Sequence, residues 1–344
     1  MNMIVFQKYK TVLLSLALTG LSFSVSAQKG ENTYQFLQLP NSARSTGLGG
    51  TNISLDDIDL SLSYHNPALL SDTLDGSITL NYSNYLLDIN YGYSAFAKDF
   101  GKYGTFGAGI FFVDYGEWDE TDIYGNTIGS FSVKEFALNL TWGYQLMDQL
   151  RVGATFKPVY SVMETYKSFG LALDLGAQYS SKSDLFKAGL VIKNMGTQIV
   201  TYTHNNYEDL PFEIALGISQ KLAHAPFRLS ITYRNIQQFD IGYEVEDDSS
   251  LDDEMVYTDF DELLARHLVF GLEFLPSDNF YLMAGYNLQR RAEMKVEQNP
   301  GLVGFSWGAG IKISKFNLSY SSARYHLSGR TNFFSISTNL NRFM

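Results

Sequence analysis

Apolar and polar residues alternate along most of the chain from Ser77 onward. The pattern is clearest at 136–146, 169–179 and 305–313, where aromatic or aliphatic residues occupy every second position. Successive side chains of a β-strand point to opposite faces, so this alternation places each apolar set on one face of a strand. We count fourteen such segments, near 77–85, 88–98, 103–114, 130–146, 150–163, 167–180, 184–194, 212–222, 227–236, 265–275, 279–290, 302–313, 316–324 and 332–343.

The lengths of these segments and the connections between them indicate a transmembrane barrel. Most segments are long enough for a tilted strand to cross the hydrocarbon of a bilayer. Every second connection is tight, whereas those between are mostly longer, at 115–129, 195–211, 237–264, 291–301 and 325–331. Outer-membrane barrels have short periplasmic turns and longer external loops. We therefore predict an all-β, fourteen-stranded antiparallel transmembrane β-barrel over 77–344, in the bacterial outer membrane, with both termini on the periplasmic side.

Residues 1–27 have the pattern of a secretory signal peptide. Lys8 and Lys10 precede an apolar stretch from Val12 to Val25, and the segment ends in small residues at Ser26 and Ala27. A basic region, an apolar region and a small-residue cleavage site in this order are typical of export signals. The chain that follows holds no apolar run long enough to form a membrane helix.

Residues 28–76 do not alternate and are predicted to form an N-terminal plug in or under the barrel. Gly49 and Gly50 lie in this segment, and the run Asn66-Pro67-Ala68-Leu69-Leu70 suits a short helix with Asn66 as N-cap. The predicted inward face of the barrel is rich in small residues, which leave room for a plug. Its glycines are Gly92, Gly107, Gly109, Gly153, Gly170, Gly176, Gly189, Gly217, Gly271, Gly285, Gly308 and Gly310.

Charged residues are also predicted on the inward face. We expect them to pair with one another or with the plug, because buried charges are normally paired. They include Lys157, Asp174, Lys193, Arg228, Arg234, Glu273 and Lys312.

Composition excludes several classes of protein. The chain has no cysteine, so it has neither disulfides nor a cysteine-ligated zinc site, and no lipid-anchored cysteine follows the cleavage site. Its formal charge is −11, and ten acidic residues with no basic residue lie between Glu244 and Glu262. No basic face for a nucleic acid is visible.

No catalytic or cofactor motif stands out. The five histidines (His65, His204, His224, His267 and His326) lack the spacing of a zinc site, and the chain holds no G-x-S-x-G. The glycine pairs at 107–109 and 308–310 lie within predicted strands and not before a helix, so they do not form nucleotide-binding loops. We expect no enzyme activity, no cofactor and no metal.

Three predicted external loops are the candidates for partner binding. The first carries Trp118, Asp119 and Glu120, where the tryptophan is either an interface anchor or part of the aromatic girdle. The second carries His204 and Tyr207. The third is acidic, and is either a docking surface, a site of divalent-ion bridging to lipopolysaccharide, or a solvated mobile loop. Its residues include Asp247, Asp248, Asp252, Asp253 and Glu254.

An ordered set of motifs resembles the PorQ family of the type IX secretion system. It begins with residues 34–44 (YQFLQLPNSAR), continues through Gly47-Leu48-Gly49-Gly50 and 66–70 (NPALL), and includes 88–92 (DINYG) and 221–228 (KLAHAPFR). The set covers nearly the whole chain after residue 27. The resemblance implies a barrel like those of the FadL family, with fourteen strands.

The same resemblance implies a role as a scaffold in the attachment complex at the cell surface. There a sortase joins secreted cargo to lipopolysaccharide, and the implied partners are a PorZ-like surface protein, the sortase and the shuttle barrel. The alternative is a FadL-like transporter of hydrophobic compounds. The small and polar residues of the predicted lumen argue against it.

Overall fold

The computed structural model describes residues 32–85, 89–239, 241, 260–294, 301–326 and 329–343. The predicted signal peptide, and the acidic residues Asp247, Asp248, Asp252, Asp253 and Glu254, lie outside the described residues. No helix among the described residues is both long and apolar enough to cross a membrane.

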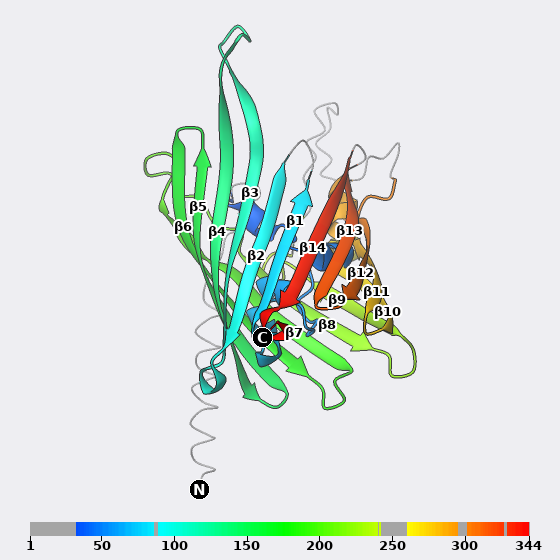
Figure 1. Cartoon of the computed structure of the whole chain (residues 1–344). Coiled ribbons are helices and arrows are strands. Elements are labelled where there is room, and N and C mark those ends of the chain that lie inside the picture. The colour runs from blue at the N-terminus through cyan, green and yellow to red at the C-terminus, as the bar shows by residue number, and fades with distance from the viewer. Residues whose placement is uncertain are drawn as a thin grey trace. The chain divides into compact units, whose positions relative to one another are not determined.

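Fourteen antiparallel strands close into one barrel, which confirms the predicted fold (Figure 1). Each strand pairs with its neighbours in the chain, and the last pairs with the first from Ser77↔Asn339 to Asn84↔Asn332, so no strand edge is left open. The strands are β1 (Ser77–Asn84), β2 (Asn90–Asp99), β3 (Thr105–Thr121), β4 (Thr127–Met147), β5 (Leu150–Met163), β6 (Tyr166–Ser180), β7 (Phe186–Val200), β8 (Glu213–Lys221), β9 (Phe227–Tyr233), β10 (Leu268–Ser277), β11 (Phe280–Asn287), β12 (Phe305–Ile313), β13 (Phe316–His326) and β14 (Gly329–Asn339).

The two ends of the barrel differ as the connections predict. Short turns such as those after β4, β10 and β12 lie at one end, which we call the short-turn end, at the bottom of Figure 1. The long connections after β7, β9 and β11 lie at the other, which we call the loop end. Two of them contain short helices, α3 (Phe260–Arg266) and α4 (Leu288–Met294). The predicted strand to residue 290 is therefore too long, because β11 ends at Asn287.

The connection predicted at 115–129 is not a loop. After a register shift between Asp114 and Glu117, β3 and β4 pair again up to Thr121↔Thr127, so they form a hairpin longer than the other strands at this end (Figure 1). Gly116, with φ of 82°, allows the chain to bend at the shift. The tip is a tight turn in which the carboxylate of Asp122 accepts hydrogen bonds from the backbone of Tyr124 and Asn126.

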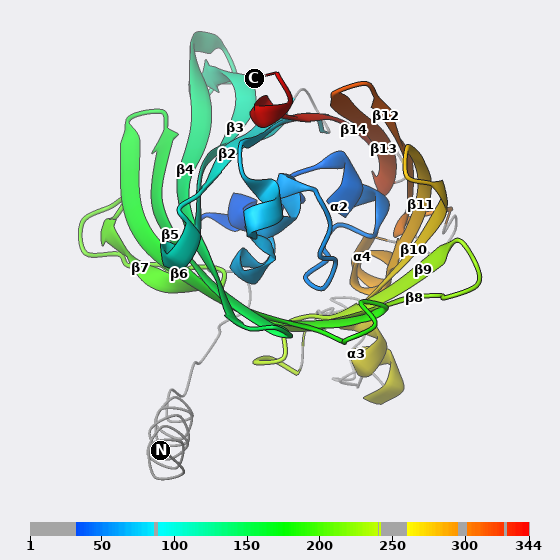
Figure 2. The ribbon, with the colours of Figure 1, turned by 60° about the horizontal axis from the view of Figure 1, so that its bottom comes forward.

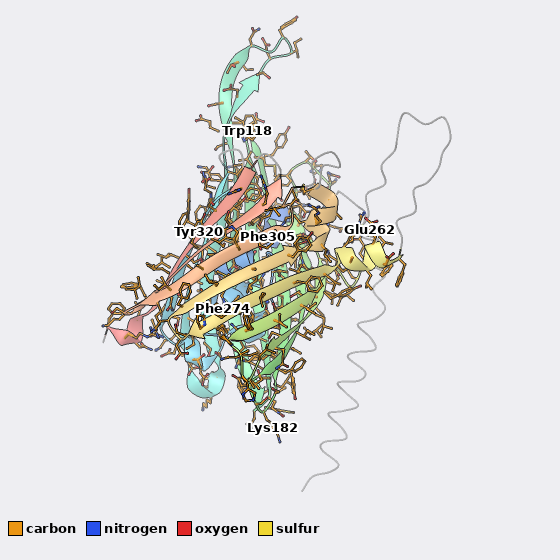
Figure 3. All side chains as sticks on the ribbon, turned by 90° about the vertical axis from the view of Figure 1, so that its right-hand side faces the viewer. Trp118, Lys182, Glu262, Phe274, Phe305 and Tyr320 are labelled. Carbon is orange, nitrogen blue, oxygen red and sulfur yellow. The ribbon has the colours of Figure 1, made fainter. Side chains whose placement is uncertain are left out.

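The outer wall of the barrel is apolar. Phe274, Phe305 and Tyr320 lie on it in Figure 3, and Leu138 and Leu140 of β4 are among its exposed residues. A closed barrel with an apolar exterior satisfies its backbone internally and matches the hydrocarbon of a bilayer. The protein is therefore an outer-membrane barrel.

The N-terminal segment folds inside the barrel as a plug, and Figure 2 shows its helices within the ring of strands. We define the plug as the described residues 32–76. It contains α2 and four 3-10 helices, and most of its side chains are buried. Its helices are η2 (Gln35–Gln38), α2 (Ala43–Gly47), η3 (Leu60–Tyr64), η4 (Pro67–Leu69) and η5 (Asp72–Leu74).

Glycines of the wall let the plug backbone approach closely. A Cβ at Gly143 would lie 2.0 Å from the carbonyl oxygen of Leu70, and a Cβ at Gly189 would lie 2.1 Å from that of Ile53. Both distances are far below contact distance, so only glycine fits there. The prediction is wrong for Gly92, which lies on the outer face against Phe112, since its neighbours in β2 point inward.

Candidate functional site: the plug network and the loop end

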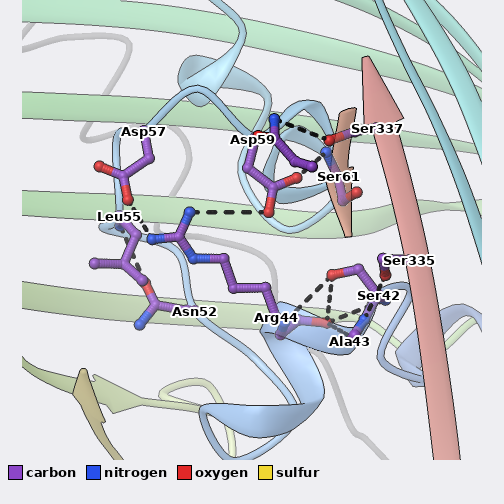
Figure 4. A network of polar contacts seen from close by, with 12 residues as sticks. Ser42, Ala43, Arg44, Asn52, Leu55, Asp57, Asp59, Ser61, Ser335 and Ser337 are labelled. Atoms are coloured by element: carbon purple, nitrogen blue, oxygen red, sulfur yellow. Dashed lines mark hydrogen bonds and ion pairs between the residues drawn. The ribbon is translucent and has the colours of Figure 1, made fainter. Parts of the chain in front are cut away.

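A network of buried charges joins the plug to β9 and β10. Arg44 of α2 donates from Nε and Nη2 to Glu273 Oε1 of β10, at 3.1 and 2.8 Å, and pairs with Asp57 of the plug. Arg228 of β9 donates to Glu273 Oε2 at 2.6 Å and to both oxygens of Asp57 at 2.9 and 2.6 Å. Figure 4 shows the plug side of this network, including the ion pair of Arg44 with Asp59 at 3.9 Å. We call Arg44, Asp57, Arg228 and Glu273 the plug network.

The charges of the plug network stabilise one another. Burial disfavours ionisation of Asp57, but the guanidinium groups of Arg228 and Arg44 outweigh it and hold the pKa of this carboxyl well below its usual range. Burial also opposes the charge of Arg44, and Glu273 and Asp57 more than compensate, so its pKa lies above the ordinary value. Asp57 and Arg44 therefore stay ionised at neutral pH.

Further ion pairs confirm most of the predicted pairing of lumen charges. Lys157 pairs with Asp174 between neighbouring strands, and both are fully buried. Arg234 donates to Glu213 at 2.5 Å. Lys193 lies 5.3 Å from the centre of the Tyr64 ring of the plug.

Two more wall residues hold the plug near the short-turn end. Arg151 and Lys187 both pair with Asp56 of the plug, at 3.0 and 3.6 Å. The expectation for Lys312 is wrong, because this residue is exposed near the short-turn end of β12 and not within the lumen.

The predicted plug motif lies against the wall. Asn66 is the N-cap of η4, where its side chain accepts from the backbone of Ala68 and donates to the carbonyl oxygen of Ile53 at 2.8 Å. Pro67 follows at the first helical position, as predicted. Gly49 and Gly50 have φ of 97° and 106°. The backbone N–H of Gly49 donates a hydrogen bond to Ser306 of the wall, and its carbonyl oxygen accepts one from Asn287. The motif positions the plug.

The first candidate for partner binding lies on the hairpin. Trp118, Asp119 and Glu120 belong to the extended part of β3, so the prediction that they lie in a loop is wrong. Trp118 is 46% exposed, and its Nε1 donates to the carbonyl oxygen of Tyr115 at 3.0 Å. Figure 3 shows it where the hairpin leaves the barrel. These residues are held by backbone pairing with β4, and their role in partner binding stays a prediction.

The other two candidates lie in connections of the loop end. His204 and Tyr207 are exposed between β7 and β8. Of the acidic segment, the described part begins at Phe260 and forms α3, where Glu262 pairs with Arg266 at 3.0 Å. Their binding roles also stay predictions. In the described part of the chain, no group of three or more potential ligands is placed to hold a metal ion.

A cavity of about 430 Å³ at the loop end was not predicted. It lies between the start of the plug, strands β3 to β6 and the connection after β7, and we call it the tyrosine cavity. Its walls include Tyr34, Tyr115, Tyr166 and Tyr202, and Glu135 of β4 and Glu208 also line it. The inward position of Glu135 was readable from the alternation of β4, but residues of the plug and the β7–β8 connection join it only through the fold.

A second hollow of about 490 Å³ lies on the outer wall over β11 to β14. Its lining is mostly apolar and includes Ile311, Leu318 and Phe334. Ser335, which also lines it, accepts a hydrogen bond from the backbone of Ala43 in the plug at 2.9 Å. Ser335 therefore contacts the plug on one side and borders the hollow on the other.

Comparison with known proteins shows a shared fold. No family model matches the sequence, and no curated protein is significantly similar to it. The toluene transporter TbuX of Ralstonia pickettii is 14% identical with a TM-score of 0.53, and the match covers 88% of this chain and 99% of TbuX. The toluene transporter TodX of Pseudomonas putida is 13% identical with a TM-score of 0.55, covering 88% and 99%.

A Pseudomonas aeruginosa FadL homologue is 11% identical with a TM-score of 0.50, and the match covers 87% of this chain and 98% of that one. The chain therefore has the fold of FadL-type outer-membrane barrels, as the sequence predicted. At sequence identities this low, the comparisons show a shared fold and nothing about function. None of these comparisons bears on the resemblance to the PorQ family.

Proposed function

We propose that this protein is a sealed outer-membrane scaffold that holds surface partners of a type IX attachment complex. The observation that carries the proposal is the fastened plug. The plug network joins it to the wall by the buried Arg44–Glu273 pair and the part-buried Arg228–Asp57 pair, and the Asp56 pairs add two part-buried contacts. Wall glycines bring the plug backbone into direct contact with the wall. The ordered resemblance to the PorQ family supports the secretion system as the setting.

The energetics of the plug favour a static role. Removing one partner of a buried ion pair costs about 3–5 kcal/mol, because the remaining charge is left buried alone. Displacing the plug would break several such pairs together. A transport cycle that moves the plug would have to recover this free energy at each passage, whereas a scaffold benefits from the rigidity.

The loop end supplies the means of holding a partner. The hairpin of β3 and β4 extends from the barrel and carries the half-exposed Trp118. Loops and hairpins held by a rigid barrel are suited to binding, and an exposed tryptophan is a frequent interface anchor. The implied partners are the PorZ-like surface protein, the sortase and the shuttle barrel, with lipopolysaccharide around the barrel.

Transport of hydrophobic compounds is the second candidate. It is the function named for the two toluene transporters of the same fold, and the fold comparisons favour it over secretion. The apolar hollow over β11 to β14 gives it a specific basis, because that hollow opens to the lipid and lies one strand away from the plug.

Deletion of the gene separates the two. For a scaffold, cargo proteins are released unattached, while the uptake of fatty acids and of toluene is unchanged. A second strain carries the full chain with 117–130 replaced by a two-residue turn; it keeps the barrel and should lose attachment. Normal attachment with reduced uptake in the deletion strain would reject the scaffold and support transport.

A further inference from the structure

Glu135 of β4 is a buried carboxylate with no cation paired to it in the described part of the chain. Four carboxylates among the described residues are less than a tenth exposed, and Asp174, Glu213 and Glu273 each pair with a lysine or an arginine. Glu135 is 3% exposed and accepts a hydrogen bond from the hydroxyl of Tyr115 at 2.6 Å. No ion pair of Glu135 occurs within the described ranges. Since buried charges in proteins are normally paired, this site lacks the cation found at the other three.

The tyrosine cavity surrounds this carboxylate with groups that suit a cation. Four of its lining residues are tyrosines, whose ring faces attract positive charge. Glu208 adds a second carboxylate, and the described residues that line the cavity include no lysine or arginine. The buried hydroxyl of Tyr202 has no hydrogen-bond partner among the described residues. A cavity of about 430 Å³ lies within the range of ligand pockets.

The approach to the cavity is also acidic. The hairpin beside the cavity carries more acidic than basic residues. On β4 its basic residue is Lys134, and on β3 and the tip its acidic residues are Asp114, Glu117, Asp119, Glu120 and Asp122. A field of this sign attracts basic groups and speeds their association. The same hairpin carries Trp118, so an apolar anchor and an acidic socket lie close together at the base of one rigid element.

We propose that the tyrosine cavity receives a lysine or arginine side chain of the surface partner. The inserted group pairs with Glu135 and packs against the tyrosine rings. It takes the place of the lysine or arginine of the chain itself that pairs with each of the other three buried carboxylates. This inference rests on the proposed scaffold function and assigns to it a specific contact. A basic side chain fits better than an apolar ligand, because an apolar ligand would leave the carboxylate buried and unpaired.

Binding of a small probe tests the socket directly. The full chain in detergent is titrated with N-acetyl-arginine amide and with the uncharged isostere N-acetyl-citrulline amide, and binding is followed by tyrosine fluorescence. We expect the arginine probe to bind roughly tenfold more tightly, as expected for one cation–aromatic and carboxylate site. Glu135→Gln should abolish the preference, and Asp278→Asn, at an exposed carboxylate in the turn after β10 at the short-turn end, should leave it unchanged.

A second variant guards against misfolding of Glu135→Gln. Tyr166 is 49% exposed, so Tyr166→Leu should leave the barrel intact, as heat-modifiable electrophoretic mobility will show, and weaken the arginine probe. Equal affinity for the two probes in the unchanged chain, or a preference that survives Glu135→Gln, would overturn the proposal.

Crosslinking in cells identifies the source of the cation. A photoreactive residue replaces Tyr166 in the full chain, and crosslinked peptides are sequenced. We expect a peptide of one surface protein with a lysine or arginine beside the crosslink. Products with lipopolysaccharide alone would overturn the protein partner. Probe binding together with normal cargo attachment in the deletion strain would reject the scaffold function and, with it, this partner, while the socket itself would stand as a small-cation site.

Discussion

Replacement of Glu273 by glutamine is the sharpest test of the fastened plug. Glu273 is 1% exposed and accepts two hydrogen bonds from Arg44 and one from Arg228. Glutamine keeps the shape but removes the charge and turns one acceptor into an amide donor that faces a guanidinium group. Two buried cations are then left with Asp57 as their main counter-charge. The loss of one partner of a buried pair costs about 3–5 kcal/mol.

Hydrogen exchange of the plug measures this cost. A loss of about 3 kcal/mol corresponds to roughly a hundredfold faster exchange of amides that open with the plug. We expect the change at 42–66, from the N-cap of α2 to the N-cap of η4, with the β4–β5 ladder unaffected. Glu262→Gln is the matched control, because its pair with Arg266 is half exposed and exposed pairs contribute about 0–1 kcal/mol. Equal exchange in the two variants would refute the idea that the plug network fastens the plug.

Three further predictions concern the wall, the plug and the orientation. Gly189→Ala should prevent correct closure of the barrel around the plug, since its Cβ would meet the plug backbone, whereas Ala108→Val on the outer face should fold normally; heat-modifiable mobility distinguishes them. Burial holds the pKa of His65 well below 6.5, so below about pH 6.5 the folded state binds fewer protons than the unfolded state and the free energy of unfolding should fall with falling pH. The variant His65→Gln should lose this pH dependence. An unfolding series from pH 8 to 5 in which the two chains show no such difference would contradict the prediction. Protease added to intact cells should cut within 237–264, and cleavage at 276–278 instead would reverse the assigned orientation.

Local patterns explain how much of the fold was predictable. Strand positions follow from alternation, which depends only on neighbouring residues and the need to face lipid on one side. The errors in where strands end lie where that constraint ends. Beyond the bilayer, β3 and β4 continue as a hairpin because backbone pairing alone holds them, and the residues after Asn287 turn into α4. The signal for a plug was also local, in the helix cap at Asn66 and the glycines at 49 and 50.

The candidate site was predicted less completely, for a physical reason. The sequence indicated which charges face inward, and pairing was expected, but the partners depend on which strands and plug segments become neighbours. Arg44 lies 229 residues from Glu273, with which it bonds. The tyrosine cavity likewise draws its walls from the plug, from strands β3 to β6 and from the connection after β7.

Sequence alone determined a lipid-embedded barrel of fourteen strands, its two unlike ends and an inward face of small residues, because each depends on a repeat of two residues and on the length of the connections. Closure of the barrel around the plug decided the rest. It selected the glycines that the plug touches. Of the four buried carboxylates among the described residues, it gave three a cation and left Glu135, near the loop end, without one. These outcomes depend on contacts between residues far apart in the chain, which no local pattern encodes.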